Sequence, residues 1–243
     1  AYAQDLRLHF QTDKFREESV RGLRRGYYGC VTYVDQQVGR VMDTLEETGL
    51  SDNTVFVYTS DHGEMLGKFG MWWKCSLYED SVRAPLIVAG PGFRKGVVDH
   101  TAVSQLDLQA SIFAATGAAR PEEWAGSPLQ ELGENDETRA TFSEYHGHGV
   151  RGSGFVIRKG KWKYIHDCEA PNQLFNIDVD RDELVNRAES ETDVAADLER
   201  ELRQICDPDV ENERADAFIN RELAAIEAAD LEMLAGGHAA FRE

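Results

Sequence analysis

The sequence predicts an α/β fold in which a mostly parallel sheet is followed by a small antiparallel sheet and by C-terminal helices. A continuous run of β-branched and aromatic residues at 54–59 follows a long helical pattern, which is typical of a buried parallel strand flanked by helices. Four short strand-like runs come later, and the C-terminal part returns to helical periodicity. The three parts are predicted at residues 1–120, 121–190 and 191–243.

The first element of the α/β part is a long helix at residues 17–49. Val31, Val34 and Val38 recur at three- and four-residue steps, and Gly49 supplies a C-terminal cap. An apolar stripe of this kind needs a covering surface, so we expect the helix to pack on the sheet.

Two apolar runs, at residues 54–59 and 84–89, are predicted strands, and residues 104–116 form the next predicted helix. Asp61 and His62 come directly after the first strand. Because ligands of open α/β sheets bind beyond the carboxyl ends of the strands, these two residues stand where chemistry is usually found.

The small antiparallel sheet is predicted from short strand-like runs at residues 140–145, 154–158, 162–166 and 173–176, with turn residues between them. Helices are predicted next, at residues 193–206 and 210–234, and Pro208 either ends the first or opens the second.

The last predicted helix has apolar residues at heptad-like positions, among them Phe218, Leu223 and Ile226. We expect these residues to dock against the rest of the chain or against a neighbouring subunit, which makes a homo-oligomer through the C-terminal helices one possible assembly.

The charge balance limits the possible partners. Lys and Arg total 26 against 44 Asp and Glu, which gives a formal net charge of −18 at pH 7. Such a chain is repelled by the phosphates of nucleic acid and by anionic lipid, so neither partner is expected. No apolar run reaches the roughly eighteen residues that a membrane span requires, so no span is expected.

The sequence Ser60-Asp61-His62-Gly63-Glu64 is the strongest candidate for a functional site. A carboxylate and an imidazole on adjacent residues can face one cation if the backbone bends, and Gly63 permits that bend. A hard divalent ion is the expected ligand. The alternative is that Asp61 caps the following helix and that His62 lies in an ordinary loop.

A series of motifs follows in a fixed order. A strand precedes Ser-Asp-His-Gly-Glu, two tryptophans precede Lys74, and then come Val-Arg-Ala-Pro-Leu-Ile-Val at 82–88, Gly-Pro-Gly at 90–92 and Gly-Lys-Trp-Lys-Tyr-Ile at 160–165. In this order and spacing they resemble the sulfatase family of the alkaline-phosphatase superfamily over most of residues 24–187. The resemblance implies an alkaline-phosphatase-like sandwich, with residues 1–120 as the second half of its α/β domain.

The resemblance also implies roles for individual residues. Asp61 and His62 would be metal ligands, for Ca²⁺ in preference to Mg²⁺ or Mn²⁺, and Lys74 would hold the sulfuryl oxygens as a catalytic residue. His62 stands where many sulfatases have Asn and where choline-sulfatase-like and phosphonate-monoester-hydrolase-like members have His. The alternative for Lys74 is a solvated surface lysine.

Three further candidates have supporting roles. His146 is flanked by glycine at the end of a predicted strand and is a candidate for substrate binding, with an exposed loop histidine as the alternative. Arg83 is expected to fix the loop that carries Lys74 by pairing with Glu79 or Asp80. Trp72 and Trp73 are candidates for substrate contact or for core packing.

The family's nucleophile motif is absent. Sulfatases carry Cys/Ser-x-Pro-x-Arg, in which the first residue becomes the formylglycine nucleophile, and this chain has no such sequence. We therefore expect a C-terminal part of a metal-dependent sulfatase, inactive alone, with a small sulfate ester as the substrate and formylglycine on preceding sequence. The alternatives are a phosphonate monoester or phosphodiester hydrolase of the same superfamily, or a non-catalytic binding or structural module.

Overall fold

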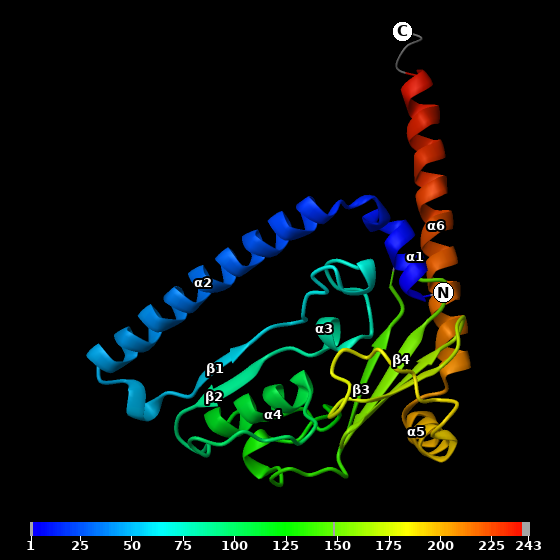
Figure 1. The fold of residues 1–243 in the computed structure, drawn as a ribbon. Helices are drawn as coiled ribbons and strands as arrows, with labels where there is room; N and C mark the ends of the chain where they lie inside the picture. The colour runs from blue at the N-terminus through cyan, green and yellow to red at the C-terminus, as the bar shows by residue number, and fades with distance from the viewer. Residues whose placement is uncertain (1, 148, 240–243) are drawn as a thin grey trace.

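The computed structural model describes residues 2–147 and 149–239 and contains, within these ranges, two separate antiparallel sheets (Figure 1). The α-helices are α1 (Tyr2–His9), α2 (Glu17–Glu47), α3 (Glu79–Val82), α4 (Gln105–Thr116), α5 (Thr192–Ile205) and α6 (Pro208–Ala239). The strands are β1 (Phe56–Thr59), β2 (Leu86–Ala89), β3 (Ala140–Tyr145), β4 (Gly154–Lys159), β5 (Trp162–Asp167) and β6 (Gln173–Asn176).

Helix α2 forms where the periodicity predicts it. Gly49 adopts a left-handed conformation with φ of 68°, and the Leu50 N–H donates to the Leu45 carbonyl, so the cap is also as predicted. The packing of α2 differs from the prediction, because none of its residues is buried. Figure 1 shows the helix at the edge of the molecule, running past the β1–β2 pair and away from the small sheet, with nothing in the described part of the chain over its apolar stripe.

Strands β1 and β2 pair with each other in the antiparallel direction, with Phe56 opposite Ala89. The prediction of a fully buried parallel strand at residues 54–59 is therefore wrong for this pair. The segment between the strands carries the short helix α3 and a 3-10 turn at Lys68–Gly70, and it returns the chain in the opposite direction, whereas a parallel pair needs a crossover back to the same end. Both strands are only partly buried.

The small sheet is a meander in the order β3-β4-β5-β6, and all four strands lie where the sequence predicts them. Its two faces are covered by different segments, which leaves it packed on both sides. On one face the strand residues Phe155, Ile157, Tyr164 and Leu174 pack with Leu198 and Leu202 of α5. On the other face Val156, Ile165 and Phe175 pack with Leu6, Met65, Met71, Cys75 and Leu77.

The second packing arrangement positions the candidate site. Met65, Met71 and Leu77 all come from the segment that connects β1 to β2, which begins with Asp61 and His62. The small sheet therefore supports the loop that follows the first strand. Burial of its apolar residues stabilises the loop by roughly 1.5–3 kcal/mol for each fully buried large side chain.

Helix α4 begins with a capping box in which Ser104 and Asp107 satisfy each other's backbone N–H groups. The Asp107 side chain is fully buried and also accepts hydrogen bonds from the Ser127 N–H and from Arg139, at 2.9 and 2.6 Å. These contacts tie the start of α4 to the chain that leads into the small sheet.

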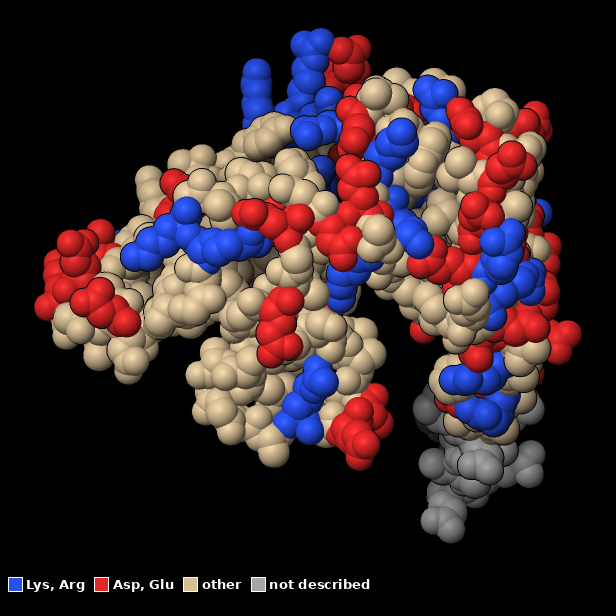
Figure 2. Space-filling view, turned by 90° about the horizontal axis from the view of Figure 1, so that it is seen from below, with Lys and Arg blue, Asp and Glu red and all other residues tan. Residues whose placement is uncertain are grey.

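The C-terminal part is helical, and Pro208 opens α6 at a position where its missing N–H costs nothing. Figure 2 shows Asp and Glu side chains gathered over the part of the molecule that carries α5 and α6, with Lys and Arg between them. No helix in the described part of the chain is both long and apolar enough to cross a lipid bilayer.

Candidate functional site

Asp61 and His62 lie immediately after β1 with their side chains together. The Asp61 Oδ2 and His62 Nε2 atoms are 3.5 Å apart. The second carboxylate oxygen, Oδ1, accepts hydrogen bonds from the His62 N–H at 3.0 Å and from the Ser60 hydroxyl at 3.3 Å. His62 Nδ1 lies 2.8 Å from the Gly63 carbonyl oxygen, so it carries the proton when the ring is neutral, and Nε2 then presents a lone pair.

This donor pair fits a divalent cation. Two ligand atoms of one cation at about 2.3–2.6 Å lie roughly 3–4 Å apart, which agrees with the separation of Oδ2 and Nε2. Desolvation raises the pKa of Asp61, but the charge of His62 and the hydrogen bonds from His62 and Ser60 outweigh it and hold that pKa below its usual value. The carboxylate is thus kept in the ionised form that binds metal.

The pair is an incomplete site within this chain. In residues 2–147 and 149–239 no group of three or more His, Cys, Asp or Glu side chains is arranged to hold a metal. A cation held by two protein ligands keeps most of its water and binds weakly.

Backbone contacts fix the bend at Gly63. Its N–H donates to the Ser81 carbonyl at 2.7 Å, and a Cβ at this position would overlap the Asp80 carbonyl oxygen, so the close approach requires glycine. Gln105, the first residue of α4, donates from Nε2 to the carbonyl oxygens of Ser60 and Asp61 at 2.6 and 3.1 Å. The strand end is thus held by α3 on one side and by α4 on the other.

The loop after Glu64 folds back on itself and returns Lys74 toward the strand end. The Met65 N–H donates to the Trp73 carbonyl at 2.8 Å, and the Trp73 N–H donates to Glu64 Oε1 at 2.6 Å. Lys74 therefore follows a residue that is hydrogen-bonded to the segment carrying Asp61 and His62. Its side chain is exposed, and it forms no ion pair with the residues that the structure describes.

A cleft of about 1170 Å³ lies between β2, α4 and the small sheet. Asp61 lines it together with Arg83, Arg158 and Arg181. Of the four sequence-predicted site residues, all within the described ranges, Asp61 is the one that lines this cleft. In Figure 2 this face of the molecule is hollowed between the part that carries α4 and the part that carries α5.

His146 is held inside the small sheet's own network. Its Nδ1 lies 2.7 Å from the Ser153 hydroxyl and its Nε2 lies 3.2 Å from Glu144 Oε2, while the ring stands edge-on to Phe155. Ser153 is 2% exposed, so this Ser–His–Glu arrangement gives a substrate no access to the hydroxyl. No contact joins His146 to Asp61, His62 or Lys74 among the described side chains.

The supporting residues differ from the predictions. Glu79 pairs with Lys163 and Asp80 with Lys68, so the predicted pairing of Arg83 with either acid is wrong, because the ammonium groups of other elements occupy those carboxylates. Trp72 is buried and its ring lies 5.8 Å from that of Phe15. Trp73 is 46% exposed and its ring lies 5.3 Å from that of Phe10.

Three residues that hold the site were given no role of their own in the sequence analysis: Glu64, Gln105 and Lys163. Gln105 carried a usable signal, since it opens the helix that the Ser104–Asp107 capping box predicts. Lys163 has the same parity as Ile165, so it points to the sheet face that packs on the β1–β2 segment, where a buried charge needs a partner.

The fold and the site together define a class of protein. The sulfatase family matches residues 3–118, and the family of N-sulphoglucosamine sulphohydrolase C-terminal regions matches residues 67–207, more than half of the chain. The chain belongs to the sulfatase family.

Curated relatives agree with this assignment. The chain is 35% identical to a choline-sulfatase of Rhizobium meliloti over 76% of its own length and 37% of the relative's. It is 34% identical to arylsulfatase K of Danio rerio, over 79% of this chain and 39% of that protein. The chain thus spans less than half the length of these relatives.

Solved structures identify the fold. A 2-O GAG sulfatase, BT1596, superposes with a TM-score of 0.70 at 26% identity and covers 93% of this chain and 50% of its own. A phosphonate monoester hydrolase from Silicibacter pomeroyi superposes with a TM-score of 0.65 at 30% identity, over 78% of this chain and 41% of its own. The chain therefore has part of the alkaline-phosphatase-like fold of these hydrolases.

Proposed function

We propose that this chain is the C-terminal part of a metal-dependent sulfatase that hydrolyses small sulfate esters. The observation that carries the proposal is the pair of donor atoms on Asp61 and His62 at the end of β1, with the Lys74 loop folded back toward it. The nucleophile belongs to sequence outside this chain, because no residue here stands in the family's nucleophile motif.

Each residue has a role in this proposal. Asp61 and His62 hold a divalent cation. Ca²⁺ is proposed ahead of Mg²⁺ and Mn²⁺ because it accepts a hard carboxylate in a flexible, partly hydrated site, although the imidazole is a more usual ligand of transition metals. A bound cation supplies charge stabilisation at the ester oxygens. Lys74 places its ammonium on the non-bridging oxygens, where negative charge grows as the ester bond breaks. His146, directly after β3, is the proposed substrate-binding residue and would contact the substrate through its ring.

The cleft beside Asp61 suits an anionic ester. Burial lowers the pKa of Arg158, and the charge of Arg83 acts in the same direction although Glu79 and Asp178 oppose it. An anion in the cleft would relieve the repulsion between the two guanidinium groups, which are natural partners of sulfate and phosphate oxygens.

The exposed apolar surface on α2 and β2 suggests that further sequence packs over it. Tyr28, Tyr33 and Val41 on α2 are 60%, 63% and 51% exposed, and Ile87 on β2 is 63% exposed. An apolar surface of this extent normally marks an interaction site. We propose that the N-terminal half of the sulfatase domain covers it and completes the set of metal ligands.

The runner-up is hydrolysis of phosphonate monoesters or phosphodiesters. The structural similarity to phosphonate monoester hydrolases favours it, and the same donor set would serve a transferred phosphoryl group. A third possibility is a non-catalytic module that keeps this half of the fold for binding.

The deciding experiment is an assay of the longer gene product against aryl sulfate, choline sulfate and phosphonate monoesters, with Ca²⁺, Mg²⁺ or Mn²⁺ restored after chelation. Turnover of a sulfate ester that Asp61→Ala abolishes supports the sulfatase. Preference for the phosphonate supports the runner-up, and no turnover with any ester or metal supports the non-catalytic module.

We also propose that α6 joins subunits. Phe218, Leu223 and Ile226 are 54%, 53% and 58% exposed on this helix. If they form the interface, Leu223→Glu converts an oligomer to a monomer in sedimentation velocity. A wild-type chain that sediments as a monomer at high concentration rejects this assembly.

A further inference from the structure

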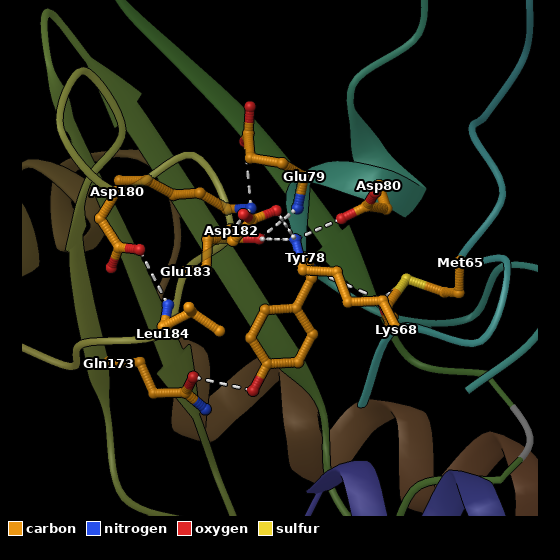
Figure 3. A network of polar contacts seen from close by, with 12 residues as sticks. Met65, Lys68, Tyr78, Glu79, Asp80, Gln173, Asp180, Asp182, Glu183 and Leu184 are labelled. Atoms are coloured by element: carbon orange, nitrogen blue, oxygen red, sulfur yellow. Dashed lines mark hydrogen bonds and ion pairs between the residues drawn. The ribbon is translucent and has the colours of Figure 1, made fainter. Parts of the chain in front are cut away.

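A fully buried ion pair joins the small sheet to the loop that follows β6 in the sequence. Lys163 on β5 has no exposed side-chain surface, and its Nζ lies 2.7 Å from Glu183 Oε1 and 3.1 Å from Glu79 Oε1. The Glu183 side chain is also fully buried. Figure 3 shows Glu79 and Glu183 close to Lys68, Asp80 and Asp182, between the sheet and the chain that leads into β2.

Stability alone does not account for these charges. Removing charged groups from water costs several kcal/mol for each ion, and apolar residues of similar volume in place of a buried pair are often neutral or stabilising. Glu183 also has a left-handed φ of 55°, which costs energy in a residue other than glycine. The two charges are therefore expected to have a role that depends on where they lie.

The pair leads to the candidate site through hydrogen bonds. Glu183 Oε2 accepts the N–H of Glu79, the first residue of α3, at 2.7 Å. The carbonyl of Ser81, in the same helix, accepts the Gly63 N–H at 2.7 Å. A buried carboxylate held by an ammonium thus fixes the start of α3, and α3 fixes the backbone directly after Asp61 and His62.

Two further contacts keep α3 in place without replacing the Glu183 bond. Lys68 forms an ion pair with Asp80, and its Nζ lies 3.9 Å from Glu183 Oε2. The Tyr78 hydroxyl, from the residue before α3, donates to Gln173 Oε1 on β6 at 3.0 Å. Both contacts are made by side chains and leave the Glu79 N–H to Glu183.

We propose that Glu183 is a positioning residue for the Asp61–His62 site, acting through α3 and Gly63, and that Lys163 supports it by neutralising its buried charge. Their importance for catalysis rests on the proposed sulfatase function, but their effect on the Gly63 backbone does not. Neither residue touches substrate, and the geometry of the donor pair depends on them because α3 has no other fixed acceptor for the Glu79 N–H among the described residues.

The test compares two double variants of the 243-residue chain that remove both buried charges. Lys163→Met with Glu183→Leu removes the acceptor for Glu79, whereas Lys163→Met with Glu183→Gln keeps an amide oxygen there. Lys159→Met with Glu201→Leu is the matched control, because that pair joins β4 to α5 at 2.8 Å and does not contact α3. Hydrogen exchange of the Gly63 amide is measured together with the amides of the β4–β5 ladder.

In the Leu variant the Gly63 amide should exchange at least about tenfold faster than in wild type, while the ladder amides stay protected. In the Gln variant and in the control, Gly63 should exchange within about threefold of wild type. Unchanged Gly63 protection in the Leu variant overturns the proposal. Equal loss of protection at the Gly63 amide and at the ladder amides in the Leu variant also overturns it, because it would mean a purely structural role. The readout needs neither metal nor substrate, so it is independent of the sulfatase assay.

Discussion

At the scale of single residues, the candidate site is a pair of adjacent donor residues followed directly by a glycine. The lone pairs of Asp61 Oδ2 and His62 Nε2 face the same space. Gly63 lets the chain turn close enough to α3 for the Ser81 carbonyl to hold it. The backbone turn at Gly63 and the donor atoms of Asp61 and His62 are therefore supplied by neighbouring positions in the sequence.

Gly63→Ala should destabilise the chain by about 1–3 kcal/mol, because the new methyl group overlaps the Asp80 carbonyl and overpacking of a fixed backbone costs this much. Urea unfolding monitored by tryptophan fluorescence measures the change. Gly29→Ala is the control, since a Cβ there meets nothing within 4 Å on α2 and should stabilise by about 0.5–1 kcal/mol. Equal midpoints for Gly63→Ala and wild type would contradict the close approach.

Lys74→Ala in the longer enzyme should lower kcat/KM by about 10²-fold, the usual cost of removing one donor from a developing oxyanion. Because the ammonium stabilises charge that grows in the transition state, kcat should fall as well as binding. Steady-state kinetics with an aryl sulfate measures both constants. A kcat/KM within about twofold of wild type would assign Lys74 to the solvated surface.

At the scale of elements, the small sheet is the support for both the site and the tail. One face receives the loop that follows β1, and the other receives α5. His166 on β5 and Glu199 on α5 join across the second face, with Nδ1 and Oε2 3.0 Å apart. Arg203 of α5 bonds the other oxygen of Glu199 at 2.6 Å.

This contact predicts a pH dependence of stability. Desolvation raises the pKa of Glu199, but His166, Arg203 and Tyr164 outweigh it and hold that pKa below its usual value of 4.5. A depressed carboxyl pKa stabilises the fold above the unfolded value and loses that contribution as the pH falls through the folded value. Glu199→Gln should therefore cost about 1 kcal/mol at pH 7 and little at strongly acid pH.

The measurement is the difference in unfolding free energy between wild type and Glu199→Gln from pH 7 downward. The expected difference is constant at neutral pH and shrinks below the usual glutamate pKa. A difference that grows on acidification would reverse the sign of the linkage and reject the assignment.

At the scale of the whole molecule, the chain combines a well-packed small sheet with an exposed α/β part. The sheet is buried on both faces, whereas α2 has no buried residue and β1 and β2 are partly exposed. The chain covers 50% of the solved chain of the 2-O GAG sulfatase BT1596. The exposed surfaces and the incomplete metal site lie in the same part of the fold.

The isolated chain should show no turnover of an aryl sulfate even at saturating metal. Metal and lysine stabilise charge, but water is a poor nucleophile at sulfur and the covalent route needs a residue that this chain lacks. A sensitive assay of the purified 243-residue chain is the measurement. Turnover that disappears in Asp61→Ala would show that the chain carries its own nucleophile.

Local patterns in the sequence were enough to predict most elements. The strands of the small sheet and the helices α2, α4 and α5 lie within a few residues of their predicted positions, because periodicity, caps and turn residues act over short distances. The direction in which β1 and β2 pair was predicted wrongly, because pairing depends on the path of the intervening loop. The exposure of α2 was missed because burial depends on a covering surface.

For the candidate site, the sequence by itself was enough to propose the donors, Asp61, His62 and Lys74, because a motif fixes residue types and spacing. Only the tertiary structure revealed what holds them: the Ser81 carbonyl, Gln105 and the buried Lys163–Glu183 pair. These groups come from elements up to about half the chain apart in sequence, and their contacts follow from how the elements pack. Packing is decided by the whole chain at once, so no local pattern records it.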